Sequence, residues 1–341
     1  MKKVLFASTA LVAFGGAAVA DVALSGRAEM GIADSDSGVA GENVSTQFFT
    51  DIDVTFTMTG ETDNGLTFGA SVDLDEGGDG SSASDDNTDD GGATIFISGG
   101  FGTVTMGDTD GAMDWALTEA GNIGNGGSIA DDETSHEGYL GSYLDGAFGQ
   151  DGQILRWDYS SGAFGVAISF EQGDRDLGAT TGVADESDGF ALGFKYALDL
   201  SGTTVNFGLG YQSISDASDA SVAGAFDVDT IGVSVNAAFA NGLSAGIVFS
   251  DIDSDDAGNT FDGDHIGLGL GYTTGALTLH ANYGKFEVDN GGEAEGFGLS
   301  AAYDLGGGAV VHFGYGDSEV TDAAGASVDS SSVSLGLGLS F

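Results

Sequence analysis

The feature that most constrains this chain is an alternation of apolar with small or polar residues at a period of two. In the last segment, apolar side chains at Val333, Leu335, Leu337, Leu339 and Phe341 alternate with Ser332, Ser334, Gly336, Gly338 and Ser340. Segments of this kind, each about ten residues long, recur along the chain and are separated by polar connections. Because successive side chains of a strand point to opposite faces, each segment predicts a β-strand with one apolar face.

Sixteen such segments follow one another, and the connections between them are alternately short and long. The segments begin near residues 22, 46, 66, 93, 102, 153, 163, 189, 203, 229, 243, 264, 276, 295, 309 and 330. The connections 61–65, 160–162 and 273–275 are short, whereas 76–92 and 173–188 are long and acidic. A soluble barrel has no reason to sort its connections by side, but a transmembrane barrel does. The sequence therefore predicts an all-β fold, a sixteen-stranded antiparallel transmembrane β-barrel.

Composition and aromatic placement support the same fold. The chain has no proline, which cannot donate to a sheet ladder, and its 61 glycines argue against helices. Seven of the nine tyrosines occupy positions of the apolar face, close to strand ends. The two interfacial belts of aromatic residues of a membrane barrel lie at such positions. The seven are Tyr159, Tyr196, Tyr211, Tyr272, Tyr283, Tyr303 and Tyr315.

The first twenty residues have the pattern of a secretory signal peptide. Lys2 and Lys3 precede an apolar run, and Ala18-Val19-Ala20 provides an Ala-x-Ala cleavage site before Asp21. The sequence thus predicts a signal peptide at 1–20, cleaved between Ala20 and Asp21, and a barrel domain at 21–341.

The charge balance excludes several classes of protein. The chain has 54 acidic and 7 basic residues, and two of the basic residues are Lys2 and Lys3. Residues 21–341 therefore carry 49 negative charges in excess. This excludes nucleic acid as a partner, because binding it requires basic side chains that neutralise the phosphates. The absence of cysteine excludes disulfides and a thiolate nucleophile.

The longest connection, residues 108–151, is far longer than a hairpin requires. It contains Trp115, Ile123, Ile129 and Tyr139, and it is too apolar for a freely solvated loop. Loops of this length in a compact barrel are usually functional. We expect this segment to pack against the inner wall of the barrel.

Charged residues in and near this segment form the candidate pore site. Strand parity directs Arg27, Arg156 and Lys195 toward the lumen, and the long connection begins with four acids, Asp108, Asp110, Asp114 and Glu119. A basic wall that faces an acidic loop sets a field across the narrowest part of a pore. The alternative is that these charges are solvated residues of the lumen without a special role.

Three segments and the last residue resemble the Gram-negative general porins, in particular those of alphaproteobacteria such as Rhodobacter. They are Gly99 to Asp108 (GGFGTVTMGD), Asp114 to Leu117 (DWAL), Ile154 to Ser160 (ILRWDYS) and the terminal Phe341. The resemblance extends from Asp21 to Phe341. It implies a barrel that is usually a homotrimer, whose third extracellular loop (108–151 here) folds into the lumen and narrows it. It also implies that Phe341 is an assembly signal read by the barrel assembly machinery.

The function expected from these observations is that of an outer-membrane general diffusion porin. Small hydrophilic solutes and ions would pass through a water-filled channel, and the excess of carboxylates predicts a preference for cations. The expected surroundings are outer-membrane lipid and lipopolysaccharide. A substrate-preferring channel of the same fold is the first alternative.

Acidic clusters raise the question of calcium. Asp251 to Asp256 resembles the start of an EF-hand loop, but Asp256 occupies the place of the required glycine. No dedicated metal site and no cofactor are therefore expected. Loosely bound Ca2+ between acidic loops and lipopolysaccharide is the remaining expectation.

A barrel hydrolase is the alternative from the enzyme class. It would need a serine and a histidine within reach of each other. The histidines are His136, in the long connection, and His265, His280 and His312, which parity turns inward on three different strands. Ser135 is only a chain neighbour of His136, so the sequence predicts a channel and no enzyme.

Overall fold

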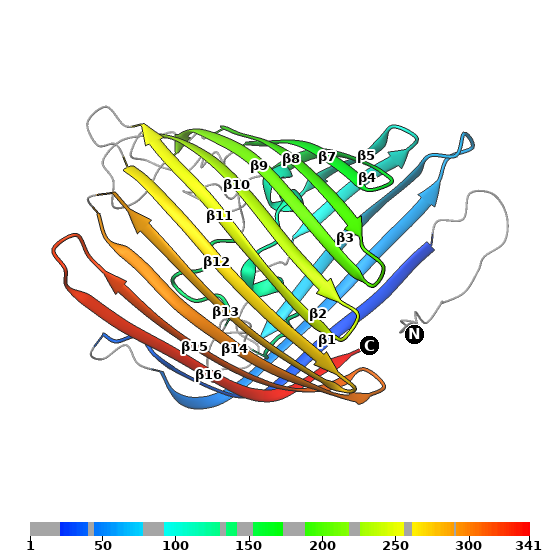
Figure 1. Ribbon diagram of the computed structural model, residues 1–341. Helices are drawn as coiled ribbons and strands as arrows, with labels where there is room; N and C mark the ends of the chain where they lie inside the picture. The colour runs from blue at the N-terminus through cyan, green and yellow to red at the C-terminus, as the bar shows by residue number, and fades with distance from the viewer. Residues whose placement is uncertain are drawn as a thin grey trace, which may run out of the picture.

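Sixteen antiparallel strands close into one barrel in the computed structural model (Figure 1). The structure describes residues 21–39, 44–77, 92–129, 134–141, 153–172, 188–217, 226–255, 261–289 and 291–341, and the expected signal peptide lies outside them. The strands are β1 (Asp21–Asp36), β2 (Val44–Glu61), β3 (Thr67–Gly77), β4 (Ala93–Gly99), β5 (Gly102–Gly107), β6 (Gln153–Ser161), β7 (Phe164–Gln172), β8 (Asp188–Asp199), β9 (Thr203–Ala217), β10 (Phe226–Phe239), β11 (Leu243–Asp255), β12 (Phe261–Thr274), β13 (Leu277–Val288), β14 (Glu293–Gly306), β15 (Ala309–Thr321) and β16 (Ser327–Ser340).

The sixteen-stranded all-β prediction is confirmed. Every strand begins within three residues of the position expected from the alternation. The described helical elements, α1 (Ala112–Ala116) and the 3-10 helix η1 (Ala120–Asn122), both lie in the connection between β5 and β6. Among the described residues, no helix is long and apolar enough to cross a membrane.

The barrel closes where the first strand meets the last. β1 pairs with β16 from Arg27 opposite Ser340 to Asp36 opposite Ser331. The ladder continues one residue further, because the main-chain N–H of Phe341 donates to the carbonyl of Gly26 at 2.8 Å. Closure matters because a sheet edge in hydrocarbon would leave peptide groups without hydrogen-bond partners.

The two faces of each strand differ as the alternation predicts. On β9, Phe207, Leu209 and Tyr211 are exposed on the outside of the ring, and Leu209 is 46% exposed. Between them, Gly208 and Gly210 lie on the inner face, against residues of the β5–β6 connection. An exposed apolar outer face is the surface that lipid covers in a transmembrane barrel.

Glycines shape the short turns at one end of the barrel. Gly162 joins β6 to β7 and Gly275 joins β12 to β13, each with a φ of +61°. No atom of the described residues lies within 4 Å of where a Cβ would stand on either glycine. Only glycine adopts this left-handed conformation without steric cost, so tight turns at these positions favour it.

At the other end of the barrel, tyrosine–carboxylate pairs mark where the outer apolar face stops. The hydroxyl of Tyr211 donates to Asp229 at 2.7 Å, and that of Tyr283 donates to Glu295 at 2.8 Å. Tyr315 pairs with Asp317 in the same way. Because tyrosine has an apolar ring and a polar tip, these pairs lie where an apolar band meets water or lipid headgroups.

A cation on the outer face should destabilise the barrel. We expect Leu209→Arg to lower the free energy of unfolding by about 2–4 kcal/mol, because the guanidinium would face hydrocarbon near the bilayer midplane. Unfolding of the barrel in lipid vesicles, followed by urea titration, measures the change.

The matched control is Ser71→Arg, which places the same side chain on the inner face of β3. Gly208 is unsuitable as a control, since a Cβ there would lie 2.3 Å from the carbonyl oxygen of Ala116. Equal stability losses for Leu209→Arg and Ser71→Arg would contradict the assignment of the two faces.

Candidate functional site

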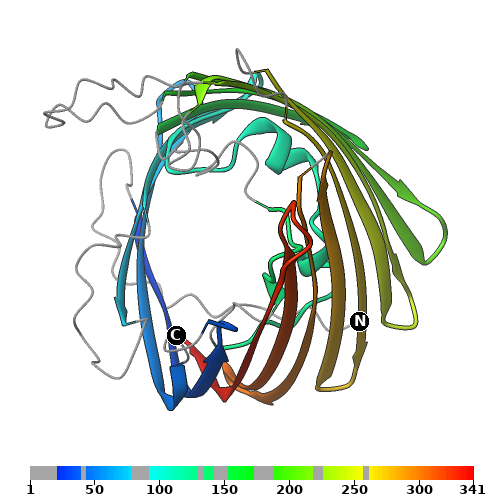
Figure 2. The same cartoon turned by 90° about the vertical axis from the view of Figure 1, so that its left-hand side faces the viewer.

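The connection between β5 and β6 provides most of the candidate pore site. Its described residues, 108–129 and 134–141, lie inside the ring of strands and follow the inner wall from β7 round to β16 and β1 (Figure 2). The main-chain N–H of Ala112 donates to Ser169 on β7 at 2.8 Å, and that of Thr118 donates to Ser234 on β10 at 3.0 Å. Further along, the side chain of Asn282 on β13 donates to the carbonyl of Thr134 at 2.6 Å.

Inner-face glycines allow the segment to lie close to the strands. A Cβ on Gly193 of β8 would stand 1.9 Å from the carbonyl oxygen of Ala112, and one on Gly210 of β9 would stand 2.4 Å from Met113. At the far end of the segment, a Cβ on Gly31 of β1 would lie 2.3 Å from Ile129. At each of these positions the connection lies where a Cβ would be, so part of the high glycine content serves this interface.

Three histidines attach the segment to the wall. His265 on β12 bonds the carbonyl of Gly138 through Nε2 at 3.1 Å. His280 on β13 bonds the carbonyl of Ile123 through Nδ1 at 3.0 Å, and His312 on β15 bonds that of Gly127 at 2.9 Å. Since a carbonyl only accepts, each of these ring nitrogens must carry its hydrogen. These three side chains were predicted to point inward, and their inward direction serves to attach the segment to the wall.

Arg156 on β6 lies at the point where the segment leaves the wall. Its Nη1 donates to the main-chain carbonyl of Asp110 at 2.6 Å and lies 3.7 Å from the carboxylate of the same residue. Its Nε lies 3.5 Å from Asp158. The short bond to the carbonyl is the stronger contact, because the Asp110 side chain is 62% exposed and water screens the ion pair. Arg156 therefore holds the main chain, while the Asp110 carboxylate faces solvent.

Lys195 on β8 contacts an aromatic side chain rather than an acid of the segment. Its Nζ lies 3.3 Å from the centre of the Trp115 ring and donates to the Trp115 carbonyl at 3.3 Å. An ammonium over an indole face is attracted by the ring's quadrupole. The contact keeps a positive charge beside Arg156 and fixes α1 to the wall.

The remaining predicted residues lie elsewhere. Arg27 on β1 is five strands from β6 around the ring, and it forms an ion pair with the buried Glu29 of its own strand. Glu119 accepts hydrogen bonds from Tyr139 at 2.7 Å and from Asn122, so its contacts are within the segment. Asp114 belongs to α1, and Asp108 is exposed directly after β5.

The structure thus brings Arg156, Lys195 and Asp110 together and separates them from Arg27 and Glu119. Sequence reasoning did not assign roles to Trp115 or Ser169, which contact Lys195 and Ala112. For Ser169 a signal was present, because the alternation places its side chain on the inner face. No pattern in the sequence indicated which aromatic residue Lys195 would contact.

Comparisons with known proteins agree on one family. The family model described as Gram-negative porin matches residues 7–323. The porin of Rhodobacter capsulatus is 30% identical over 283 residues, which cover 79% of this chain and 87% of that protein. A porin structure refined at 1.8 Å resolution is 27% identical, with a TM-score of 0.68, and covers 94% of this chain and 100% of that one. A variant of Rhodopseudomonas blastica porin shares the fold, with a TM-score of 0.57 and 21% identity. That match covers 94% of this chain and 100% of the variant.

A closed sixteen-stranded barrel with an apolar outer face and a charged inner wall defines an outer-membrane channel protein. The chain belongs to the Gram-negative porin family, and the predicted likeness to Rhodobacter porins is confirmed. The family and the fold indicate a channel rather than an enzyme.

Acid should loosen the attached segment through His136. This side chain is 7% exposed, and neither ring nitrogen has a hydrogen-bond partner among the residues that the structure describes. Burial, together with the nearby His265, lowers the pKa of His136 from 6.5 to about 4. The attached state therefore favours the neutral ring. Its stabilisation is fully present above pH 6.5 and is lost as the pH falls toward 4, by about 3 kcal/mol in total.

Channel recordings at pH 7.5 and pH 4.5 measure this effect. We expect larger current fluctuations at pH 4.5 because the segment detaches more often, and His136→Gln, which cannot be protonated, should reduce the difference. An acid response of the same size in His136→Gln would assign the effect to other groups.

Proposed function

We propose that this outer-membrane porin is a general diffusion channel with a preference for cations, in which the 108–151 connection forms the constriction. The observation that carries the proposal is the distribution of charge on the inner wall. Glu29, Asp51, Asp53 and Asp73 occupy the inner face of β1 to β3, where Arg27 is the basic residue. A field from these carboxylates concentrates cations and depletes anions.

The basic residues of the lumen only partly offset these acids. Arg27 is paired with Glu29, and Arg156 lies within ion-pair distance of both Asp110 and Asp158. Salt screens charge over about 8 Å at physiological ionic strength, which is comparable to the radius of a narrowed lumen. The net negative field therefore acts on ions at the constriction.

Transport through such a channel is passive. Solutes below a size limit diffuse down their own gradients through water that wets the inner wall. Small hydrophilic solutes and ions fit this mechanism, since serine, threonine and aspartate side chains exchange hydrogen bonds with them as readily as with water.

The surroundings of the channel follow from its outer face. We place it as a homotrimer in the outer membrane, with lipid on the rest of its apolar surface. The outward acids near the tyrosine pairs, including Asp229, Glu295 and Asp317, would meet lipopolysaccharide through loosely bound divalent cations.

Ion selectivity tests the proposal directly. Reversal potentials across a tenfold KCl gradient should have the sign of cation selectivity, and the preference should weaken as the total salt rises because screening increases. Anion selectivity, or a preference that does not change with ionic strength, would contradict the proposal.

Two variants at one contact sharpen this test. Arg156→Ala removes a positive charge and should increase the cation preference and the conductance. Asp110→Asn removes a negative charge from the same pair and should decrease the preference. If both variants shift the reversal potential in the same direction, the pair does not act through its charge.

The C-terminal residue is proposed to act in assembly. The Phe341 side chain is 77% exposed on the outer face, and its main chain extends the ladder to Gly26. Deletion of Phe341 should lower the amount of folded protein in the outer membrane, because the last strand would lack its recognition residue. The unit conductance of the remaining channels should be unchanged, and normal abundance would count against an assembly role.

A further inference from the structure

A cavity of about 370 Å³ lies in the lumen between α1 and the short turns of the barrel. Its wall is formed by residues 115–118 of the β5–β6 connection, the turn between β6 and β7, the end of β8 and the beginning of β9. The strand register places Ser160, Gly165, Lys195, Ala197 and Asn206 of this lining on the inner face. The volume is within the range of small-molecule sites.

The charge of this cavity is opposite in sign to the net charge of the chain. The chain has 54 acidic and 7 basic residues. Lys195 is nevertheless the one charged residue among the fourteen described residues that line the cavity. A lysine in a cavity whose described lining has no carboxylate attracts anions locally.

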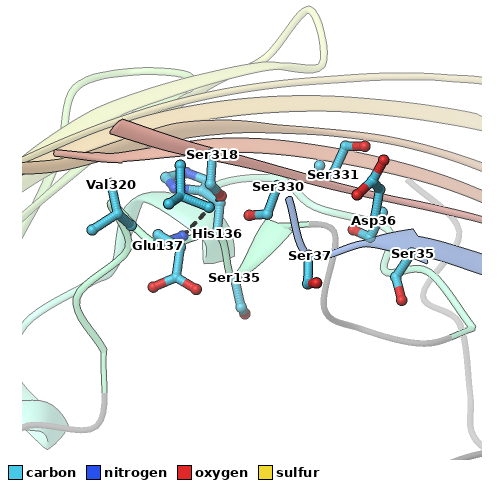
Figure 3. A pocket seen from close by; sticks show the side chains of 13 residues that line it. Ser35, Asp36, Ser37, Ser135, His136, Glu137, Ser318, Val320, Ser330 and Ser331 are labelled. Carbon is cyan, nitrogen blue, oxygen red and sulfur yellow. Dashed lines mark hydrogen bonds between the residues drawn. The ribbon is translucent and has the colours of Figure 1, made fainter. Parts of the chain in front are cut away.

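A second cavity, of about 320 Å³, lies at the long-connection end of the lumen and has the prevailing sign of charge (Figure 3). Its lining includes Glu137, whose main-chain N–H donates to Ser318 at 3.1 Å, and its described lining residues include neither lysine nor arginine. The two cavities therefore differ in the sign of their charge.

Lys195 also differs from the other described basic residues in its ionic partners. Each of the others has carboxylates within ion-pair distance: Glu29 for Arg27, Asp110 and Asp158 for Arg156, and Glu287 and Glu293 for Lys285. In the part of the chain that the structure describes, no carboxylate lies within that distance of the Lys195 ammonium. Asp158, Arg156 and Asp110 act on it from further away. The ammonium thus has room for a carboxylate that the chain itself does not provide.

The ammonium retains hydrogen-bond donors for a ligand. One of its three N–H groups is directed to the main-chain carbonyl of Trp115 at 3.3 Å, which leaves two. Ser160 and Thr118 each add a hydroxyl to the lining. A carboxylate has two oxygens, so it can accept from the ammonium and from a hydroxyl at the same time.

An aromatic ring beside the ammonium favours an organic anion over an inorganic one. Nζ of Lys195 lies 3.3 Å from the centre of the Trp115 ring, and the indole remains half-buried. A Cβ on Gly165 would stand 2.8 Å from Cη2 of Trp115, so the indole lies directly against the wall of the cavity. An apolar group attached to a carboxylate can cover this indole, whereas phosphate has no apolar part and is bound best by several cations.

We propose that this cavity is a binding subsite for small organic carboxylates that carry an apolar group, with the carboxylate on Lys195 and the apolar group beside Trp115. The inference goes beyond the proposed function and rests on it for the access of solute from the lumen. A lumen whose field attracts cations depletes anions. A local site of opposite charge lets the channel take up a class of solute that this field alone would disfavour.

Two substitutions of Ala197 test the proposal and keep the contact between Lys195 and Trp115. Ala197 is exposed on the inner face, two residues after Lys195 on β8, so Ala197→Asp places a carboxylate beside the ammonium. Ala197→Asn adds a side chain of the same shape without the charge. Saturation-transfer NMR of the purified folded protein, titrated with benzoate, measures the dissociation constant. We expect this constant to rise about tenfold in Ala197→Asp, because the new carboxylate competes for the ammonium, and to stay nearly unchanged in Ala197→Asn.

Two further comparisons define the ligand and the cavity. Benzamide, the uncharged analogue of benzoate, should not compete with benzoate, and added KCl should weaken benzoate binding because salt screens the ammonium. Glu137→Gln changes the charge of the cavity at the long-connection end and should leave the benzoate constant unchanged. In planar bilayers, benzoate added on the short-turn side should produce current noise that reaches saturation and is reduced in Ala197→Asp.

Each failure has a separate meaning. Equal benzoate constants in the wild type and Ala197→Asp would overturn the assignment to Lys195, and so would competition by benzamide. Inorganic phosphate that displaces benzoate at equal concentration would overturn the organic class of ligand. Channels that conduct while the protein binds no benzoate would overturn the subsite alone, whereas benzoate binding by a protein that does not conduct would contradict the proposed function and leave the subsite intact.

Discussion

Every peptide group that faces hydrocarbon must find its hydrogen-bond partner within the protein, and the rest of this structure depends on that requirement. A β-chain satisfies it only by closing its sheet, which here means that β1 pairs with β16 and Phe341 extends the ladder to Gly26. Once the ring is closed, each strand has one face toward lipid and one toward water. The alternation of side chains follows from this geometry, and so does the placement of Glu29, Asp51 and Asp53 on the inner face.

The inner face carries a second interface, between the wall and the β5–β6 connection. Glycines at positions such as Gly193 and Gly208 let main chain approach main chain, and His265, His280 and His312 bond carbonyls of the connection. All four histidines of the chain lie at this interface, with His136 contributed by the connection itself. A chain with so few basic groups thus uses imidazole N–H groups as the donors to main-chain carbonyls of the connection.

Charge is arranged differently on the two faces. On the inner wall, Arg156 and Lys195 donate to the carbonyls of Asp110 and Trp115 and so hold the beginning of the connection. Both of these cations are therefore engaged in structural contacts. On the outer face, Lys285 pairs with acids near the tyrosine boundary. On each face, the carboxylates near these cations outnumber the basic side chains that pair with them. The proposed cation preference follows from this surplus of acceptors.

The sequence by itself determined the strand number, the strand positions and the face of residues such as Leu209 and Arg156, because a period of two is a local property of the backbone. It also indicated the long connection and its apolar character. Only the tertiary structure decided the partners that the β5–β6 connection provides: Trp115 for Lys195 and Tyr139 for Glu119. Which side chains meet across a lumen depends on the path of a forty-residue connection along the wall, and no local pattern encodes that path.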